Sequence, residues 1–296
     1  MLAVLIGAIA LGIAYFCWTM FQALRAKPAR PLPEAIVVGA VTNFFDALGI
    51  GSFAPTAAWL RFRRHVPDRL IPATMLIGHT PPTFVQALIF LVLLGVGVDP
   101  VLLTGCAAAL TVGTRFGVDL ATRAPVRAVQ AVVAGALVLA AMFYALANLE
   151  MMPVGGTASA LPPALTATAI AGSFVFGVLV CFGVGHYAPM LVMLSLMGMD
   201  PRLCFPIMAG GGAVAAAGAC VRYIKTTDVD LRIPLGLALG GIPAVLVAAL
   251  VVKSLPIEPL RWLVIVVVLY AAASLLLSAL RGDGKAEAPA HGAAGG

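Results

Sequence analysis

The sequence predicts an all-α polytopic membrane protein. Three observations carry this prediction: 62% of the 296 residues are hydrophobic, only 10% are charged, and the mean hydropathy is +1.07. A soluble domain has about 45–50% apolar and about 25% charged residues, because its surface must face water. The composition therefore excludes a soluble enzyme and a disordered chain, and it indicates a chain surrounded by lipid.

The net charge of +6 does not indicate a nucleic-acid partner. The 18 Lys and Arg residues lie almost entirely in short gaps between apolar runs, which is the pattern that sets membrane topology. The five cysteines form no CxxC motif and are interpreted as small buried hydrophobic residues. We therefore expect no nucleic acid, no metal and no cofactor. The expected partners are a lipid bilayer and a small anion, and the oligomeric state is left open.

The first apolar segment, 1–24, is predicted to be a retained span. Arg25, Lys27 and Arg30 follow it, whereas a signal peptide carries its positive charge before the apolar run. Because positive loops stay in the cytoplasm, the N-terminus is expected outside and the C-terminus inside. The further predicted spans are 75–97, 101–120, 128–149, 205–221, 234–252 and 261–281, followed by a disordered cytoplasmic tail, 282–296.

Two more apolar stretches, 35–60 and 164–197, contain glycine and proline near their middle. Basic residues flank 35–60 on both sides, so both of its ends are predicted to be cytoplasmic. We therefore interpret it as a re-entrant pair of half-helices that meet near Gly49–Ser52. A straight helix of this length would span about 39 Å, so it could also cross the bilayer at a tilt. The hairpin is therefore favoured by the charge pattern and not by length. The same count places both ends of 164–197 outside.

Glycines and prolines recur at a constant offset of 134 residues, as between positions 51 and 185. The matched pairs are Gly49–Gly183, Gly51–Gly185, Ala54–Ala188, Pro55–Pro189, Leu60–Leu194, Pro67–Pro201, Pro72–Pro206, Gly78–Gly212, Pro100–Pro234, Pro125–Pro259 and Arg127–Arg261. Each unit holds one interrupted stretch and three spans, so the second unit is inverted, as in many secondary transporters. The predicted organisation is an N-terminal span and loop (1–34), a first repeat (35–149), a connector (150–168), a second repeat (169–281) and the tail (282–296).

The two breaks are the predicted binding site. At each break a half-helix begins with backbone N–H groups at membrane depth, where an unpaired donor is costly. A small anion would accept from these donors, and the helix dipole would favour it. Close helix packing is the alternative explanation for the glycines and is left open. The candidate substrate-binding residues are Asn43, Gly49, Gly51, Ser52, Phe53, His79, Thr80, Gly183, Gly185, His186, Tyr187, Met208, Gly210 and Gly211.

Polar side chains within the apolar runs have open roles. Asp46 either carries a coupling proton or caps a backbone group, since a charge at mid-depth is expensive and should face a cavity. His79 and His186 either donate to an oxyanion or hold the structure together. Tyr187 could donate its hydroxyl hydrogen to the same ligand. The glycine run at 210–212 permits close approach to the second break or serves helix packing.

The segments Asn43–Ala54 and Gly183–Pro189 resemble the sulfite exporter family, TauE/SafE. Ile71–His79 and Phe205–Met208 add to a likeness that covers most of 35–281. Ser52 and His186 stand where many members have a third glycine. The resemblance implies a carrier in the bacterial inner membrane for sulfite or small organosulfonates.

The expected function is therefore secondary transport of a small sulfur-containing anion, with proton coupling left open and no enzymatic activity. Two alternatives remain. An intramembrane hydrolase would use Ser52 with His79 or His186 and would need a Ser–His hydrogen bond. A membrane assembly subunit would bind no substrate.

Overall fold

The computed structural model describes residues 2–48, 51–94, 97–123 and 156–251, with single positions between 125 and 151 and at 269 and 273. Apart from those positions, the predicted spans 128–149 and 261–281 lie outside the described residues, as do Gly49 and the tail. The described part is mostly helical and contains no strand, as the composition predicted.

Nine α-helices are described, together with one short 3₁₀ turn. In chain order they are α1 (Leu2–Ala26), α2 (Pro33–Ala47), α3 (Phe53–Arg63), the turn Asp68–Leu70, α4 (Ile71–Leu94), α5 (Pro100–Arg123), α7 (Pro163–Val180), α8 (Tyr187–Leu196), α9 (Pro201–Thr226) and α10 (Arg232–Val251). Among the described residues, six helices are long and apolar enough to cross a membrane: α1, α4, α5, α7, α9 and α10. These helices indicate a multi-pass membrane protein.

Both predicted interruptions are present. Helix α2 stops before the first break and α3 begins after it, while α7 and α8 are separated in the same way by the second break. Gly51 has φ +86° and Gly183 has φ +90°, a left-handed conformation that glycine adopts without strain. Pro33 and Pro163 lie in the first turns of α2 and α7, where a missing N–H is harmless.

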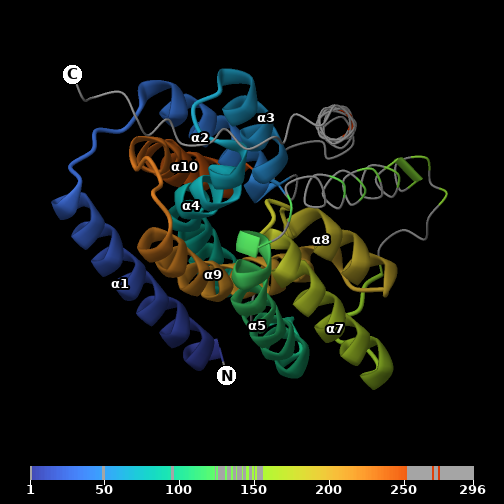
Figure 1. The fold of residues 1–296 in the computed structure, drawn as a ribbon. Coiled ribbons are helices and arrows are strands. Elements are labelled where there is room, and N and C mark those ends of the chain that lie inside the picture. Colours follow the sequence, from blue (N-terminus) through green and yellow to red (C-terminus); the bar gives the residue numbers. More distant parts are fainter. Residues whose placement is uncertain are drawn as a thin grey trace, which may run out of the picture.

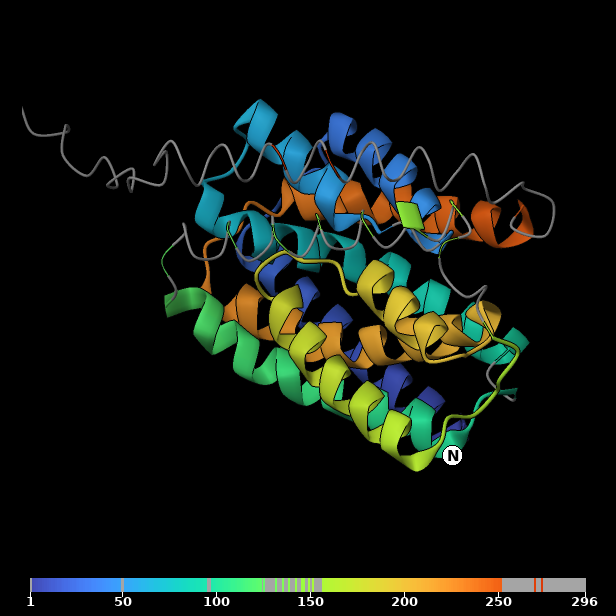
Figure 2. The same ribbon diagram turned by 90° about the vertical axis from the view of Figure 1, so that its right-hand side faces the viewer.

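The first helix of each broken pair packs on a helix far away in the sequence. Helix α2 lies along α10, and α7 lies along α5 (Figures 1 and 2). A Cβ placed on Gly240 of α10 would lie 1.8 Å from the carbonyl oxygen of Ile36, and one on Gly113 of α5 would lie 2.1 Å from that of Phe174. The backbones are therefore in direct contact, which is how small residues bring membrane helices together.

Helices α4 and α9 form the centre of the bundle. They pack against each other, and α4 also contacts α10 while α9 contacts α5. In the described residues, 83% of the apolar stretch of α9 is buried, compared with 28% of that of α1. Helix α1 runs along one edge of the bundle (Figure 1) and exposes large apolar side chains such as Leu11 and Trp18. Those side chains are suited to contact lipid.

The loops gather at two ends of the bundle. At one end Lys27 pairs with Asp228 at 2.6 Å, and the N–H of Leu32 donates to the carbonyl of Arg232. This end joins the loops that the charge pattern placed together on the cytoplasmic side. Helix α9 has 26 residues, or about 39 Å, and separates this end from the other one.

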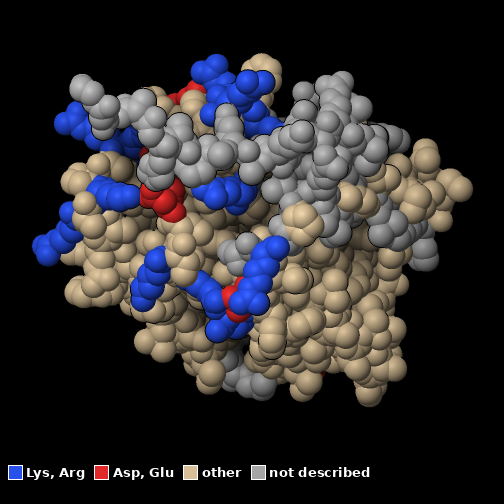
Figure 3. Space-filling model, viewed as in Figure 1, with Lys and Arg blue, Asp and Glu red and all other residues tan. Residues whose placement is uncertain are grey.

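At the second end the connector packs against the loops that precede α5 and α9. The N–H groups of Asp99 and Asp200 donate to the carbonyls of Ser159 and Ala158, each at 3.0 Å. Lys and Arg gather over α2 and α3, and a second charged group lies over α5 and α9, where Asp119 pairs with Arg115 and Arg222 (Figure 3). Helix α7 carries no charged residue.

Candidate functional site

The two breaks touch each other inside the bundle. A Cβ built on Gly185 of the second break would lie 3.5 Å from Cβ of Phe53, the first residue of α3. That distance is ordinary van der Waals contact, so a methyl group would just fit there and a longer side chain would press on Phe53. The two breaks therefore border one small volume.

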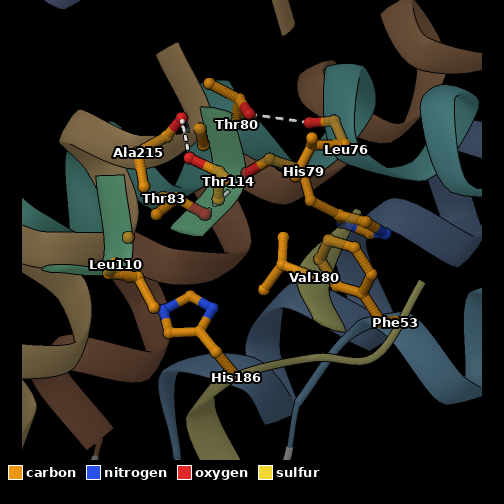
Figure 4. Close-up of a pocket in the computed structure, with 12 residues that line it drawn as sticks. Phe53, Leu76, His79, Thr80, Thr83, Leu110, Thr114, Val180, His186 and Ala215 are labelled. Atoms are coloured by element: carbon orange, nitrogen blue, oxygen red, sulfur yellow. Dashed lines mark hydrogen bonds between the residues drawn. The ribbon is translucent and has the colours of Figure 1, made fainter. Parts of the chain in front are cut away.

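A pocket lies at this meeting point (Figure 4). Its lining comes from both breaks and from α4, α5 and α9: Phe53, Leu76, His79, Thr80, Thr83, Leu110, Thr114, Val180, His186, Gly212, Ala215 and Ala216. The volume open to the centre of a water molecule is about 20 Å³, which is room for roughly one water. His79 and His186 approach the pocket from opposite sides, with Val180 between them (Figure 4).

His79 is held by two polar neighbours. Its Nδ1 lies 3.1 Å from Oδ1 of Asn43, and its Nε2 lies 3.0 Å from Oγ1 of Thr56. The amide nitrogen of Asn43 donates to the carbonyl of Gly39, so Oδ1 of Asn43 accepts and Nδ1 of His79 carries a hydrogen. The ring of His79 is thereby fixed beside that of Phe53, with ring centroids 5.6 Å apart.

The hydroxyl of Thr56 joins His79 to the first break. The hydroxyl oxygen of Thr56 is 2.8 Å from the carbonyl oxygen of Ser52 as well as 3.0 Å from Nε2 of His79. A hydroxyl has one hydrogen. A neutral His79 offers Nε2 as an acceptor for this hydrogen, whereas an imidazolium would donate from Nε2 and leave the hydrogen to Ser52. The N-terminus of α3 is thus linked to the protonation state of His79.

Asp46 closes the first break. Its Oδ1 accepts the backbone N–H of Ser52 at 2.7 Å, and both residues are buried. Of the two roles left open by the sequence, capping of a backbone group is the one seen here. The backbone N–H of Ser52, the residue before α3, is therefore paired with a carboxylate of the chain itself.

The second break has no such cap. Val180 stands at the position equivalent to Asp46, and no side chain accepts from the first turn of α8. The first turn of α8 has two N–H groups without a partner inside the helix, those of Tyr187 and Ala188, because Pro189 has none and Met190 bonds to His186. Helix α3 begins in the same way, so the difference between the breaks is the carboxylate that pairs with Ser52. The two breaks thus share a backbone plan but differ in chemistry.

His186 is oriented by a backbone carbonyl. Its Nε2 lies 3.1 Å from the carbonyl oxygen of Met208, and a carbonyl only accepts, so Nε2 carries a hydrogen. A Cβ on Gly212 would lie 2.6 Å from this nitrogen. Glycine at position 212 therefore leaves the space that the imidazole occupies.

Gln86 of α4 connects the two breaks. With its amide nitrogen facing Asp46, it donates to Oδ2 at 3.3 Å and to the Tyr187 hydroxyl at 2.9 Å, and its oxygen accepts from the N–H of Ala47. With the amide turned over, its oxygen accepts from the Tyr187 hydroxyl at 2.9 Å. Both Gln86 and Tyr187 are buried.

The predicted site residues fall into three groups. Phe53, His79, Thr80 and His186 line the pocket. A second group holds these residues or shapes the breaks: Asn43, Gly51, Ser52, Gly183, Gly185, Tyr187 and Met208. Gly210 and Gly211 face other helices, since their Cβ positions would meet Leu91 and Ala107.

Several residues of the site were not predicted, namely Thr56, Thr83, Gln86 and Thr114, and Gly212 was predicted only as part of the glycine run at 210–212. One signal was available in the sequence. His79, Thr83 and Gln86 are spaced i, i+4 and i+7, which places them on one face of α4. A polar stripe of this kind inside an apolar span indicates a buried polar site.

No group of three His, Cys, Asp or Glu residues that could hold a metal occurs in the part of the chain that the structure describes. In comparisons with known proteins, no family model, no curated protein and no solved structure matches this chain.

Proposed function

We propose that this chain is a secondary transporter of a small oxyanion, with sulfite and small organosulfonates as its substrates. The observation that carries the proposal is the close approach of Gly185 to Phe53, beside a pocket that is lined from both breaks and includes His79 and His186. The substrate class comes from the resemblance of the two break segments to the sulfite exporter family.

An inverted repeat is supported by the correspondence between the halves. Helices α3 and α8 begin at positions 53 and 187, at the offset of 134 residues found in the sequence. The packing of α2 on α10 is matched by that of α7 on α5.

The ends of each broken pair also lie close together, which supports two re-entrant hairpins. Arg63 at the end of α3 contacts Glu34 at the start of α2 at 2.9 Å. Ala158, before α7, pairs with Met199, after α8. The first hairpin thus opens to the basic end of the bundle and the second to the opposite end. In our proposal the basic end is cytoplasmic, in the inner membrane of a bacterium.

The anion would bind at the first turn of α8. Its free N–H groups and the helix dipole favour negative charge by about 0.3–1 kcal/mol at an exposed site and by more where water is excluded. Sulfite is larger than one water, so it enters only when the two breaks move apart. Such movement of one repeat against the other is the basis of alternating access.

The hydrolase alternative lacks the contact it requires. In the described residues, the ring nitrogens of His79 face Asn43 and Thr56, and Nε2 of His186 faces Met208. Ser52 makes no hydrogen bond to either histidine there. We therefore propose transport without enzymatic activity.

Flux into liposomes tests the proposal. Purified protein is reconstituted and the uptake of sulfite, thiosulfate, sulfate, sulfoacetate and acetate is measured with and without a pH gradient. We expect saturable uptake of sulfite or a sulfonate. Gly185→Leu should abolish it, because the side chain would fill the contact with Phe53.

Gly218→Leu is the matched control. A Cβ at this exposed position of α9 meets nothing within 4 Å, so this variant should transport normally. Normal transport by Gly185→Leu would exclude the breaks as the site. Absence of saturable uptake of every anion by the wild type would overturn the proposed function.

A further inference from the structure

The hydrogen-bonded chain Asp46–Gln86–Tyr187 joins the end of α2 to the first residue of α8. We propose that Asp46 takes up one proton for each anion that binds in the pocket, so that anion and proton cross together. This inference rests on the proposed function and adds the residue, the stoichiometry and the route by which the two breaks are coupled.

The charge balance of the pocket requires a proton. None of its lining residues is Lys or Arg, so the pocket itself offers no fixed positive charge to an anion. Asp46 is bonded to Ser52, the residue directly before Phe53 in the pocket wall. A second negative charge placed in this buried region would be repelled by the carboxylate and would lose its hydration. A proton on Asp46 removes the repulsion.

The surroundings of Asp46 leave few other places for that proton. From α4, His79 reaches the same break through Thr56 and Ser52, and from α8 Tyr187 reaches it through Gln86. Helix α10 packs along α2, but its single charged residue, Arg232, lies at its first position and is paired with Asp230. His186 also lines the pocket, beside Tyr187. Among the described groups, His79 and His186 are therefore the competing proton acceptors, and the test separates them from Asp46.

The Gln86 amide fits both protonation states of Asp46. When Asp46 is a carboxylate, the amide nitrogen of Gln86 donates to Oδ2 at 3.3 Å. When Asp46 is a carboxylic acid, its new O–H needs an acceptor, and the turned amide presents its oxygen at the same place, at the cost of the hydrogen bond from the N–H of Ala47. Rotation of the Gln86 amide thus accompanies protonation of Asp46.

This rotation changes the bond to the second break. With the carboxylate, Gln86 donates to the oxygen of Tyr187, whose own hydrogen is then free to go elsewhere. With the acid, the oxygen of Gln86 accepts the hydrogen of Tyr187. Since Tyr187 is the first residue of α8, protonation at the first break alters the polar surroundings of the proposed anion site at the second.

Calorimetric titration of purified protein with sulfite measures the proton directly. Each titration is run in two buffers of different protonation enthalpy, which gives the number of protons taken up per anion bound. Wild type should take up about one more proton than Asp46→Asn. Any proton that sulfite itself gains is common to both proteins and cancels in the difference.

The dependence of affinity on pH provides a second readout. At pH values where Asp46 of the free protein is ionised, the Kd of the wild type for sulfite should rise about tenfold per pH unit, as expected when one proton is linked to binding. Any change that comes from the titration of sulfite itself is subtracted first. Asp46→Asn should lose this slope and bind at least as tightly at high pH. Asp228→Asn removes an exposed carboxylate that pairs with Lys27 and should behave like the wild type.

The outcomes separate the inference from the proposed function. Equal proton uptake by wild type and Asp46→Asn would overturn it, and loss of that uptake in His79→Gln or His186→Gln would assign the proton to that histidine instead. If Asp46→Asn does not fold, a flat pH dependence of the wild type overturns the inference on its own. Absence of saturable sulfite binding by the wild type would overturn the proposed function and the inference together.

Discussion

The carboxylate of Asp46 lies 2.7 Å from the backbone nitrogen of Ser52, across the first break and six positions away in the chain. At the equivalent place in the second break stands Val180, which cannot accept a hydrogen bond. The N–H of the residue before α3 is therefore paired with a carboxylate, whereas no side-chain acceptor stands at the equivalent place before α8. The two interrupted segments thus differ in chemistry, and in the proposed transporter the second one holds the anion.

Loss of the Asp46 carboxylate should destabilise the first break. Asp46→Ala leaves the buried N–H of Ser52 without its acceptor and should lower the free energy of unfolding by about 1–3 kcal/mol. Asp46→Asn keeps a carbonyl oxygen at the same place and should cost less. Thermal unfolding of both variants in detergent checks this order. Equal stability of the two variants would contradict the capping role.

Gly212→Ala should weaken anion binding while leaving the fold intact. Its methyl group would lie 2.6 Å from Nε2 of His186 and would push the ring away from the carbonyl of Met208. We expect the Kd for sulfite to rise at least ~10-fold, which corresponds to about 1.4 kcal/mol. Gly218→Ala, where a Cβ meets no atom within 4 Å, should bind like the wild type. Unchanged binding by Gly212→Ala would remove His186 from the site.

The packing of α2 on α10 and of α7 on α5 should require glycine at the closest contacts, where a hydrogen atom fits and a methyl group does not. Gly240→Ala and Gly113→Ala would each drive a methyl group into a carbonyl oxygen of the facing helix, Ile36 or Phe174. Overpacking of this kind typically costs about 1–3 kcal/mol. Gly7→Ala on α1 meets nothing within 4 Å and is the control. Melting temperatures in detergent should fall for the first two variants only.

The breaks could be predicted because the residues that make them act locally. A left-handed φ at Gly51 and at Gly183 needs glycine, and a proline in the first helical turn is visible in the sequence. The start of α4 was less accurate: the predicted span began at 75, whereas the helix begins at Ile71. Its first turn includes Pro72. A helix tolerates proline there, but a hydropathy profile does not indicate that the helix has already begun.

The network behind the pocket could not be predicted in the same way. Gln86 and Tyr187 are 101 positions apart, so their bond depends on how α4 and α8 are packed. The choice among the three consecutive glycines at 210–212 of α9 depends on rotation of the helix, since neighbouring residues point about 100° apart. Gly212 faces His186, whereas Gly210 and Gly211 face other helices. Sequence spacing identifies such a run but not which member meets the ligand.

The acid stability of the first hairpin should depend on Glu34, at the end of α2 away from the break. Trp59 donates to its Oε1 at 2.9 Å and Arg63 to its Oε2 at 3.1 Å. The hydrogen bond from Trp59, with the bond and the charge of Arg63, holds the pKa of Glu34 below its ordinary value. A lowered pKa means that the ionised form stabilises the fold. This contribution is complete above the unfolded-state pKa of about 4.3 and is lost as the pH falls through the lower folded-state pKa.

Melting temperatures measured from pH 6 down to about pH 3 check this prediction, because that range spans the ordinary glutamate pKa. The wild type should lose more stability over the acid part of this range than Glu34→Gln, which has no proton to gain. Trp59→Phe removes the N–H that makes the largest contribution and should fall between the two. An identical acid profile for wild type and Glu34→Gln would show that the bonds between the ends of α2 and α3 do not hold the hairpin closed.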